Sequence, residues 1–133
     1  MLSSTITIVG NLSADPELHY TSGGIAVTNF TIAVNSRYKK GEQWEDKLEG
    51  FFRCNAWREM AEHVAESLTK GQRVLVTGKL QQRHWEDADG NKRQAVDIEV
   101  EEVGPSLKFA TAAVTKAEKR EMAAVAPADE GGF

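Results

Sequence analysis

Two stretches of the sequence place aromatic rings and cations on one side of an extended chain. In the first, residues 73–86, the odd positions include three cations and an indole: Arg73, Lys79, Arg83 and Trp85. Side chains alternate between the two faces of a strand, so these residues share a face if the segment is a strand. A flat ring can stack on a nucleotide base, and a guanidinium group attracts phosphate. The spacing is therefore typical of a surface that meets a flexible nucleic acid.

The second stretch, residues 50–57, repeats the pattern independently. Its outer positions are Phe51, Arg53, Asn55 and Trp57, and they alternate with a plausible inner face of Phe52, Cys54 and Ala56. Aromatic and arginine residues are also enriched where subunits meet. From the residues alone, a stacking surface and a subunit interface carry equal weight.

A hairpin over residues 72–103 must position the first stretch. Its arms are separated by Ala88-Asp89-Gly90-Asn91, and Asp-Gly between alternating segments is a strong hairpin signal. The even positions of both arms form one apolar face, made of Val74, Val76, Leu80, Val96, Ile98 and Val100. Trp85 and its cations are therefore predicted to point away from the core.

The remaining elements predict a small barrel. We expect strands at 4–9, 25–38 and 50–57, a short strand at 17–21, and a further strand at 107–114 after a break at Gly104-Pro105. Met60, Val64 and Leu68 recur every fourth residue, which predicts a helix ended by Lys70-Gly71. The charged segment 37–47 is expected to be a loop at a mobile, projecting hairpin tip. Five main strands with one helix between the third and fourth predict a mainly β, OB-type Greek-key barrel with long β-hairpin loops.

Size and composition predict one domain with a core. The chain has 133 residues, 41% of them hydrophobic, and we expect a domain at 1–115 followed by a short flexible tail at 116–133. The net charge of -4 means that any cationic surface must be local. A single cysteine, Cys54, excludes an intrachain disulfide and suits a reducing cytosol. We expect no signal peptide and no membrane span.

No constellation in the sequence predicts catalysis, a cofactor or a metal. The chain has no GxSxG, HExxH or P-loop pattern. The loop at 87–91 lacks the glycine and the glutamate that a calcium loop needs, since Lys92 and Ile98 occupy those positions. Cys54 falls on the inner face of its strand, so we expect a buried structural thiol.

Several motifs resemble those of bacterial single-stranded DNA-binding proteins, in order and spacing, from residue 4 to about 115. They are IVGNL at 8–12, DPE at 15–17, VTNF at 27–30, the segment from Trp57-Arg58 to Lys70-Gly71, and VTGKL at 76–80 with Trp85 downstream. The segments FRCN at 52–55 and GPSL at 104–107 resemble the actinobacterial branch of this family.

The resemblance implies an OB fold and a homotetramer that coats single-stranded DNA in the cytoplasm, at the nucleoid, during replication, recombination and repair, without enzymatic activity. It places the base-stacking rings on Tyr38, Phe51, Trp57 and Trp85. We expect phosphate charge to be offset by Arg37, Arg53, Lys79, Arg83, Lys92 and Arg93. It also implies that residues 107–114 form a strand that joins subunits.

The C-terminal tail departs from the family pattern. Members usually end in an acidic tip with Pro-Phe, through which replication and repair proteins are recruited. This chain ends in Asp129-Glu130-Gly131-Gly132-Phe133, which keeps two acids and the terminal ring but lacks the proline. Recruitment through Asp129, Glu130 and Phe133 is therefore a weaker expectation than DNA binding.

Overall fold

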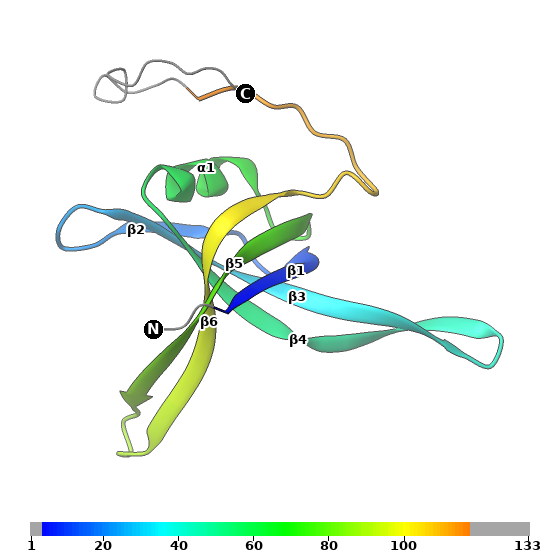
Figure 1. The fold of residues 1–133 in the computed structure, drawn as a ribbon, viewed down its shortest axis with the longest axis horizontal. Coiled ribbons are helices and arrows are strands. Elements are labelled where there is room, and N and C mark those ends of the chain that lie inside the picture. The colour runs from blue at the N-terminus through cyan, green and yellow to red at the C-terminus, as the bar shows by residue number, and fades with distance from the viewer. Residues whose placement is uncertain (1–3, 118–133) are drawn as a thin grey trace.

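The structure is a computed structural model that describes residues 4–117. Within them the chain forms six strands and one helix (Figure 1). In chain order they are β1 (Thr5–Leu12), β2 (Glu17–Tyr20), β3 (Ala26–Lys40), β4 (Gln43–Trp57), α1 (Glu59–Ser67), β5 (Arg73–Glu86) and β6 (Lys92–Pro105). With the four-residue β2 set aside, the helix lies between the third and fourth long strands, as predicted.

The sheet closes into a ring because β1 pairs on both sides. It pairs with β5 from Thr5 to Asn11, and its last two residues, Asn11 and Leu12, also pair with β3. The absence of a side chain at Gly10 permits this approach, because a Cβ there would collide with the backbone carbonyl of Ala33. β1 thus changes partner at its last residues, within one continuous strand. The closed ring confirms the predicted OB-type barrel.

The core fills the inside of this ring. The alternation predicted for 50–57 is confirmed, since Cys54 and Ala56 are fully buried and Phe52 packs against the core. The helix contributes Val64 and Leu68. It ends at Ser67, three residues before the predicted cap at Lys70-Gly71, because Leu68 adopts extended backbone and lies buried in the core. The buried cluster comprises Ile8, Leu12, Phe30, Ile32, Cys54, Ala56, Val64, Leu68, Val74, Val76, Ile98 and Val100.

Two long hairpins, β3–β4 and β5–β6, project from the barrel in different directions (Figure 1). The segment 37–47 projects as a hairpin tip, as predicted, but it is paired strand rather than loop except at its turn. Its residues pair across the hairpin out to Lys40 and Gln43, and a tight turn with Gly41 at φ 66° joins the strands. Strand pairing satisfies the backbone of a polar segment as well as water does.

Two expectations about the end of the domain were also wrong. β6 does not break at Gly104 but runs through Pro105, which pairs with Val74 at the end of the ladder, where a missing N–H is tolerated. In the single chain, residues 107–114 form no strand, while their role as a strand that joins subunits stays a prediction. In addition, Val96 is 52% exposed although it was placed on the apolar face, because the hairpin extends past the barrel there.

Candidate nucleic-acid interface

The four aromatic residues singled out from the sequence all lie at the surface. Phe51 is 61% exposed, Trp57 41%, Trp85 43% and Tyr38 41%. Phe51 and Trp57 are held outward because the intervening residues of β4 are fixed in the core. Rings left in water on a folded domain are available to stack on a ligand.

The stretches 50–57 on β4 and 73–86 on β5, which we call the two aromatic stripes, meet at Asp97 of β6. β4 pairs in parallel with β6 at Cys54 and Ile98, which brings Arg53 beside Asp97. The Asp97 carboxylate accepts hydrogen bonds from Arg83, from Nε to Oδ2 at 2.7 Å and from Nη2 to Oδ1 at 3.4 Å. Arg53 Nε lies 3.8 Å from the same Oδ2. One carboxylate therefore joins two stripes that the sequence predicted separately.

Asp97 is 4% exposed, although it stands on the outward side of β6. The two arginines cover it, while their own side chains remain about half exposed, at 49% and 46%. Asp97 was not among the site residues predicted from the sequence. Its odd position on the strand predicts only an outward carboxylate, and its burial depends on arginines that come from two different hairpins.

Arg83 also covers Trp85. Its guanidinium carbon lies 4.7 Å from the centre of the indole, within cation–π range. The hydrogen bond that Arg83 donates to Asp97 raises the pKa of Arg83, so the group stays charged. Because Asp97 fixes the guanidinium and the guanidinium contacts one side of the ring, the orientation of Trp85 is set by a chain of two contacts.

The other predicted cations divide into near and distant groups. Arg93 lies directly across the ladder from Trp85, and Lys92 lies across from Glu86, so both belong to the same hairpin end. Lys79 lies six residues before Trp85 on β5, about 20 Å away at ~3.3 Å per residue, and pairs with Glu101 at 3.8 Å. Arg37 lies on the β3–β4 hairpin and pairs with Asp46 at 3.7 Å. The structure thus places Arg37 away from the rings around Asp97, whereas Lys79 stands across from Glu99, which is the β6 neighbour of Asn55, and two residues from Gln81, the ladder partner of Asp97.

The turn at the end of β5–β6 is organised by Asp87. Its Oδ1 accepts hydrogen bonds from the backbone N–H groups of Asn91 and Asp89, and its Oδ2 accepts one from Arg93 Nε at 2.9 Å. The hydrogen bond from the Asn91 backbone and that from Arg93 lower the pKa of Asp87. These hydrogen bonds make Asp87 a structural part of the turn. Among residues 4–117, no cluster of three or more His, Cys, Asp or Glu side chains could hold a metal ion.

Tyr38 occupies a different position from the other rings. It lies on the β3–β4 hairpin, and its hydroxyl donates to Glu45 Oε1 across the ladder at 3.1 Å. It projects from the opposite side of this ribbon to Arg37 and Phe51. Its stacking role stays a prediction of the resemblance.

Cys54 is a buried thiol on the inner face of β4, as the alternation predicted. Burial, with a smaller contribution from the charge of Asp97, raises the pKa of the thiol to about 12. The group is therefore protonated at neutral pH and is a poor nucleophile.

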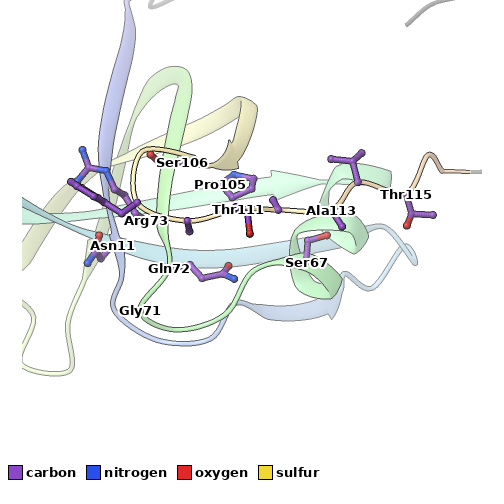
Figure 2. Close-up of a pocket in the computed structure, with 14 residues that line it drawn as sticks. Asn11, Ser67, Gly71, Gln72, Arg73, Pro105, Ser106, Thr111, Ala113 and Thr115 are labelled. Atoms are coloured by element: carbon purple, nitrogen blue, oxygen red, sulfur yellow. The ribbon is translucent and has the colours of Figure 1, made fainter.

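A groove of about 780 Å³ lies elsewhere, between the segment 109–115 and the barrel. Figure 2 shows Ser67 of α1, Gln72 and Arg73 on one side of it, and Thr111, Ala113 and Thr115 on the other. None of Phe51, Trp57 or Trp85 lines it. It is separate from the aromatic surface. The tail residues Asp129, Glu130 and Phe133 lie outside the described residues.

Helix α1 is far too short and polar to cross a lipid bilayer, and it is the one α-helix in the described range 4–117.

Comparisons with known proteins agree on one family. The sequence profile described as the Single-strand binding protein family matches residues 3–106. A protein of Mycobacterium leprae named single-stranded DNA-binding protein is 57% identical over 118 residues, which cover 87% of this chain and 70% of the relative. One of the same name from Mycolicibacterium smegmatis is 55% identical over 118 residues, covering 87% and 72%. The crystal structure of a small single-stranded DNA-binding protein from Streptomyces coelicolor matches with a TM-score of 0.70 and 32% identity, covering 80% of this chain and 97% of that one.

Proposed function

Because the chain belongs to the single-strand binding protein family, we propose that it binds single-stranded DNA on the surface around Asp97. The family consists of non-enzymatic DNA-binding proteins that act in replication, recombination and repair. The binding surface is formed by the outward side of β4 and by the free end of the β5–β6 hairpin.

Bases stack on Phe51, Trp57 and Trp85 in this proposal. Each exposed ring offers a flat apolar face that fits any base, with about 1–3 kcal/mol per stacked base, so binding tolerates any sequence. Bases in a duplex are already stacked and paired, so the rings select unpaired strands. Tyr38 adds a ring on the β3–β4 hairpin.

Phosphates are contacted by Arg53, Arg83 and Arg93, with Arg37, Lys79 and Lys92 extending the positive surface. Several of these cations already face carboxylates, but the side chains of Arg53, Arg83 and Arg93 remain about half exposed. A guanidinium group has five N–H donors. Arg83 can therefore keep its bonds to Asp97 and still donate to a phosphate.

For the wider assembly, we propose what the resemblance to the family implies. The domain at 1–115 forms a homotetramer in the cytoplasm, and the tail at 116–133 offers a weak contact for replication and repair proteins through Asp129, Glu130 and Phe133. Leu107, Phe109 and Val114 are 66%, 77% and 91% exposed in the single chain, which suits a segment that covers another subunit.

The observation that supports DNA binding most directly is the junction at Asp97, which brings the exposed rings and the arginines into one surface. Its test is a titration of the protein with oligo-dT and with duplex DNA, followed by tryptophan emission. The single strand should quench emission at low salt far more than the duplex. Trp85→Ala should weaken binding about five- to a hundredfold, and Trp85→Phe should retain most of it. Emission that ignores oligo-dT would point to a subunit interface instead.

A further inference from the structure

Trp44 is an exposed ring that the proposed surface does not use. It lies near the free end of the β3–β4 hairpin and is 58% exposed. Simple alternation along β4 would place this even-numbered residue with Cys54 and Ala56, on the inward side. The pairing of the two strands places it elsewhere.

A bulge in β4 reverses the alternation. Val34 pairs with Gly50, but the next residue, Asn35, pairs with Leu48, so Glu49 is an extra residue in β4. Directly paired residues in an antiparallel ladder project to the same side, and a bulge shifts the alternation of its own strand by one.

The unbroken alternation of β3 fixes which side Trp44 takes. Ala33 pairs with Phe51 on the outward side, so Arg37 and Lys39 project outward too. Their direct partners are Asp46 and Trp44, which must therefore share the side of Phe51. The contacts agree, since Arg37 pairs with Asp46 at 3.7 Å and lies 5.8 Å from the centre of the Trp44 ring.

This group repeats the arrangement at Trp85. In each, an arginine lies over an indole and is held by an aspartate: Arg83, Trp85 and Asp97 in one, and Arg37, Trp44 and Asp46 in the other. The outward side of the ribbon carries two cations, Arg37 and Lys39, against one carboxylate, whereas the opposite side balances Lys40 and Lys47 against Glu45 and Glu49. The ring and the net positive charge thus coincide on the side of Phe51.

We infer that Trp44 is a further base-stacking residue, and that the outward side of the β3–β4 ribbon, carrying Arg37, Lys39 and Trp44, continues the path of the single strand beyond Phe51. The inference rests on the proposed function. Trp44 lies six residue steps from Phe51 along the β3 ladder, about 20 Å. An oligonucleotide must therefore be long enough to leave the barrel before it reaches this ring.

The test compares Trp44→Ala with Tyr20→Ala, which removes an equally exposed ring (58%) from the edge strand β2. Binding of oligo-dT of about 16 nucleotides or more should weaken about five- to tenfold in Trp44→Ala and stay unchanged in Tyr20→Ala. Trp44→Phe, which keeps a ring, should restore most of the affinity. Equal affinities of Trp44→Ala and wild type would overturn the inference.

A second measurement reads Trp44 directly. The chain has three tryptophans, so Trp57→Phe/Trp85→Phe leaves Trp44 as the sole indole while keeping aromatic rings at the other two positions. Its emission should fall when oligo-dT saturates the protein, as judged by gel shift, and constant emission at saturation would refute the extended path. If wild-type protein bound no oligo-dT, the proposed function itself would fail, whereas normal wild-type binding with an indifferent Trp44 would remove only the extension.

Discussion

The carboxylate of Asp97 accepts a 2.7 Å hydrogen bond from Nε of Arg83 while the aspartate itself is 4% exposed. A negative charge beneath a surface that meets phosphate looks unfavourable by charge alone. The position of Asp97 explains why a carboxylate is present there, because this carboxylate fixes two arginines that come from different hairpins. Fixed donors lose less conformational entropy when a ligand arrives than free side chains do.

Asp97→Asn should therefore weaken the binding of oligo-dT by about two- to tenfold, even though it removes a negative charge near the DNA. Arg83 would lose its charged acceptor, and Trp85 would lose the guanidinium that orients it. The free energy of unfolding should also fall by about 1–3 kcal/mol. Fluorescence titration and urea denaturation measure the two effects.

Glu99→Gln is the matched control for this variant. Glu99 lies two residues further along β6, and its carboxylate accepts a hydrogen bond from Gln81. Among residues 4–117, no arginine forms a hydrogen bond or an ion pair with it. The same change of charge there should leave binding unchanged or slightly tighter. If Asp97→Asn also tightened the binding of oligo-dT, the net charge of the surface would matter more than the positioning of Arg53 and Arg83.

Salt dependence should separate Arg53 from Lys79, which faces its own carboxylate at a distance from Trp85. Arg53→Gln removes a cation between Phe51 and Trp57, so the slope of log affinity against log salt should fall by about one. Lys79→Gln should change the slope less, because Lys79 faces Glu101 and lies about 20 Å from Trp85. The measurement is a set of oligo-dT titrations at several salt concentrations, and equal slopes for the two variants would contradict the separation.

The buried thiol of Cys54 should make stability fall at alkaline pH. Below pH 9.0, its ordinary pKa, the thiol is protonated in both the folded and unfolded chains. Between pH 9.0 and about 12 the unfolded chain loses the proton while the folded chain keeps it, so the unfolded state is favoured as pH rises. Urea denaturation across this range should show a steeper loss in wild type than in Cys54→Ala.

The same burial should protect Cys54 from reagents. A thiol-specific alkylating agent at pH 8 should label the native protein slowly and the urea-unfolded protein at once. Fast labelling of the native protein would mean that β4 opens readily.

Gly78→Ala should destabilise the barrel. A Cβ at Gly78 would collide with the backbone carbonyl of Glu99 on β6, where little movement is available, and such overpacking costs about 1–3 kcal/mol. Gly104→Ala is the control, because no atom lies within 4 Å of the Cβ that it would add. Thermal denaturation of both variants should show a lower Tm in Gly78→Ala alone, and matching curves would argue against close contact between β5 and β6.

Much of the fold could be predicted from the sequence because side chains alternate between the two faces of a single strand. Cys54 and Ala56 are buried and Phe51 and Trp57 are exposed because successive side chains of one strand face opposite ways, a rule that needs no knowledge of the neighbouring strand. The helix was predicted for the same reason, since its four-residue repeat is local. Its end was misplaced because burial of Leu68, a tertiary contact, stopped the helix first.

The sequence by itself determined the barrel, its inner and outer faces and two separate stripes of rings and cations. The tertiary structure alone decided that Asp97 joins the stripes, that residues 37–47 form a paired ribbon, and that Trp44 shares the side of Phe51. Each of these depends on which residues of two strands stand opposite one another. That register is set by contacts between distant segments and by the extra residue at Glu49, and neither leaves a trace in the periodicity of a single strand.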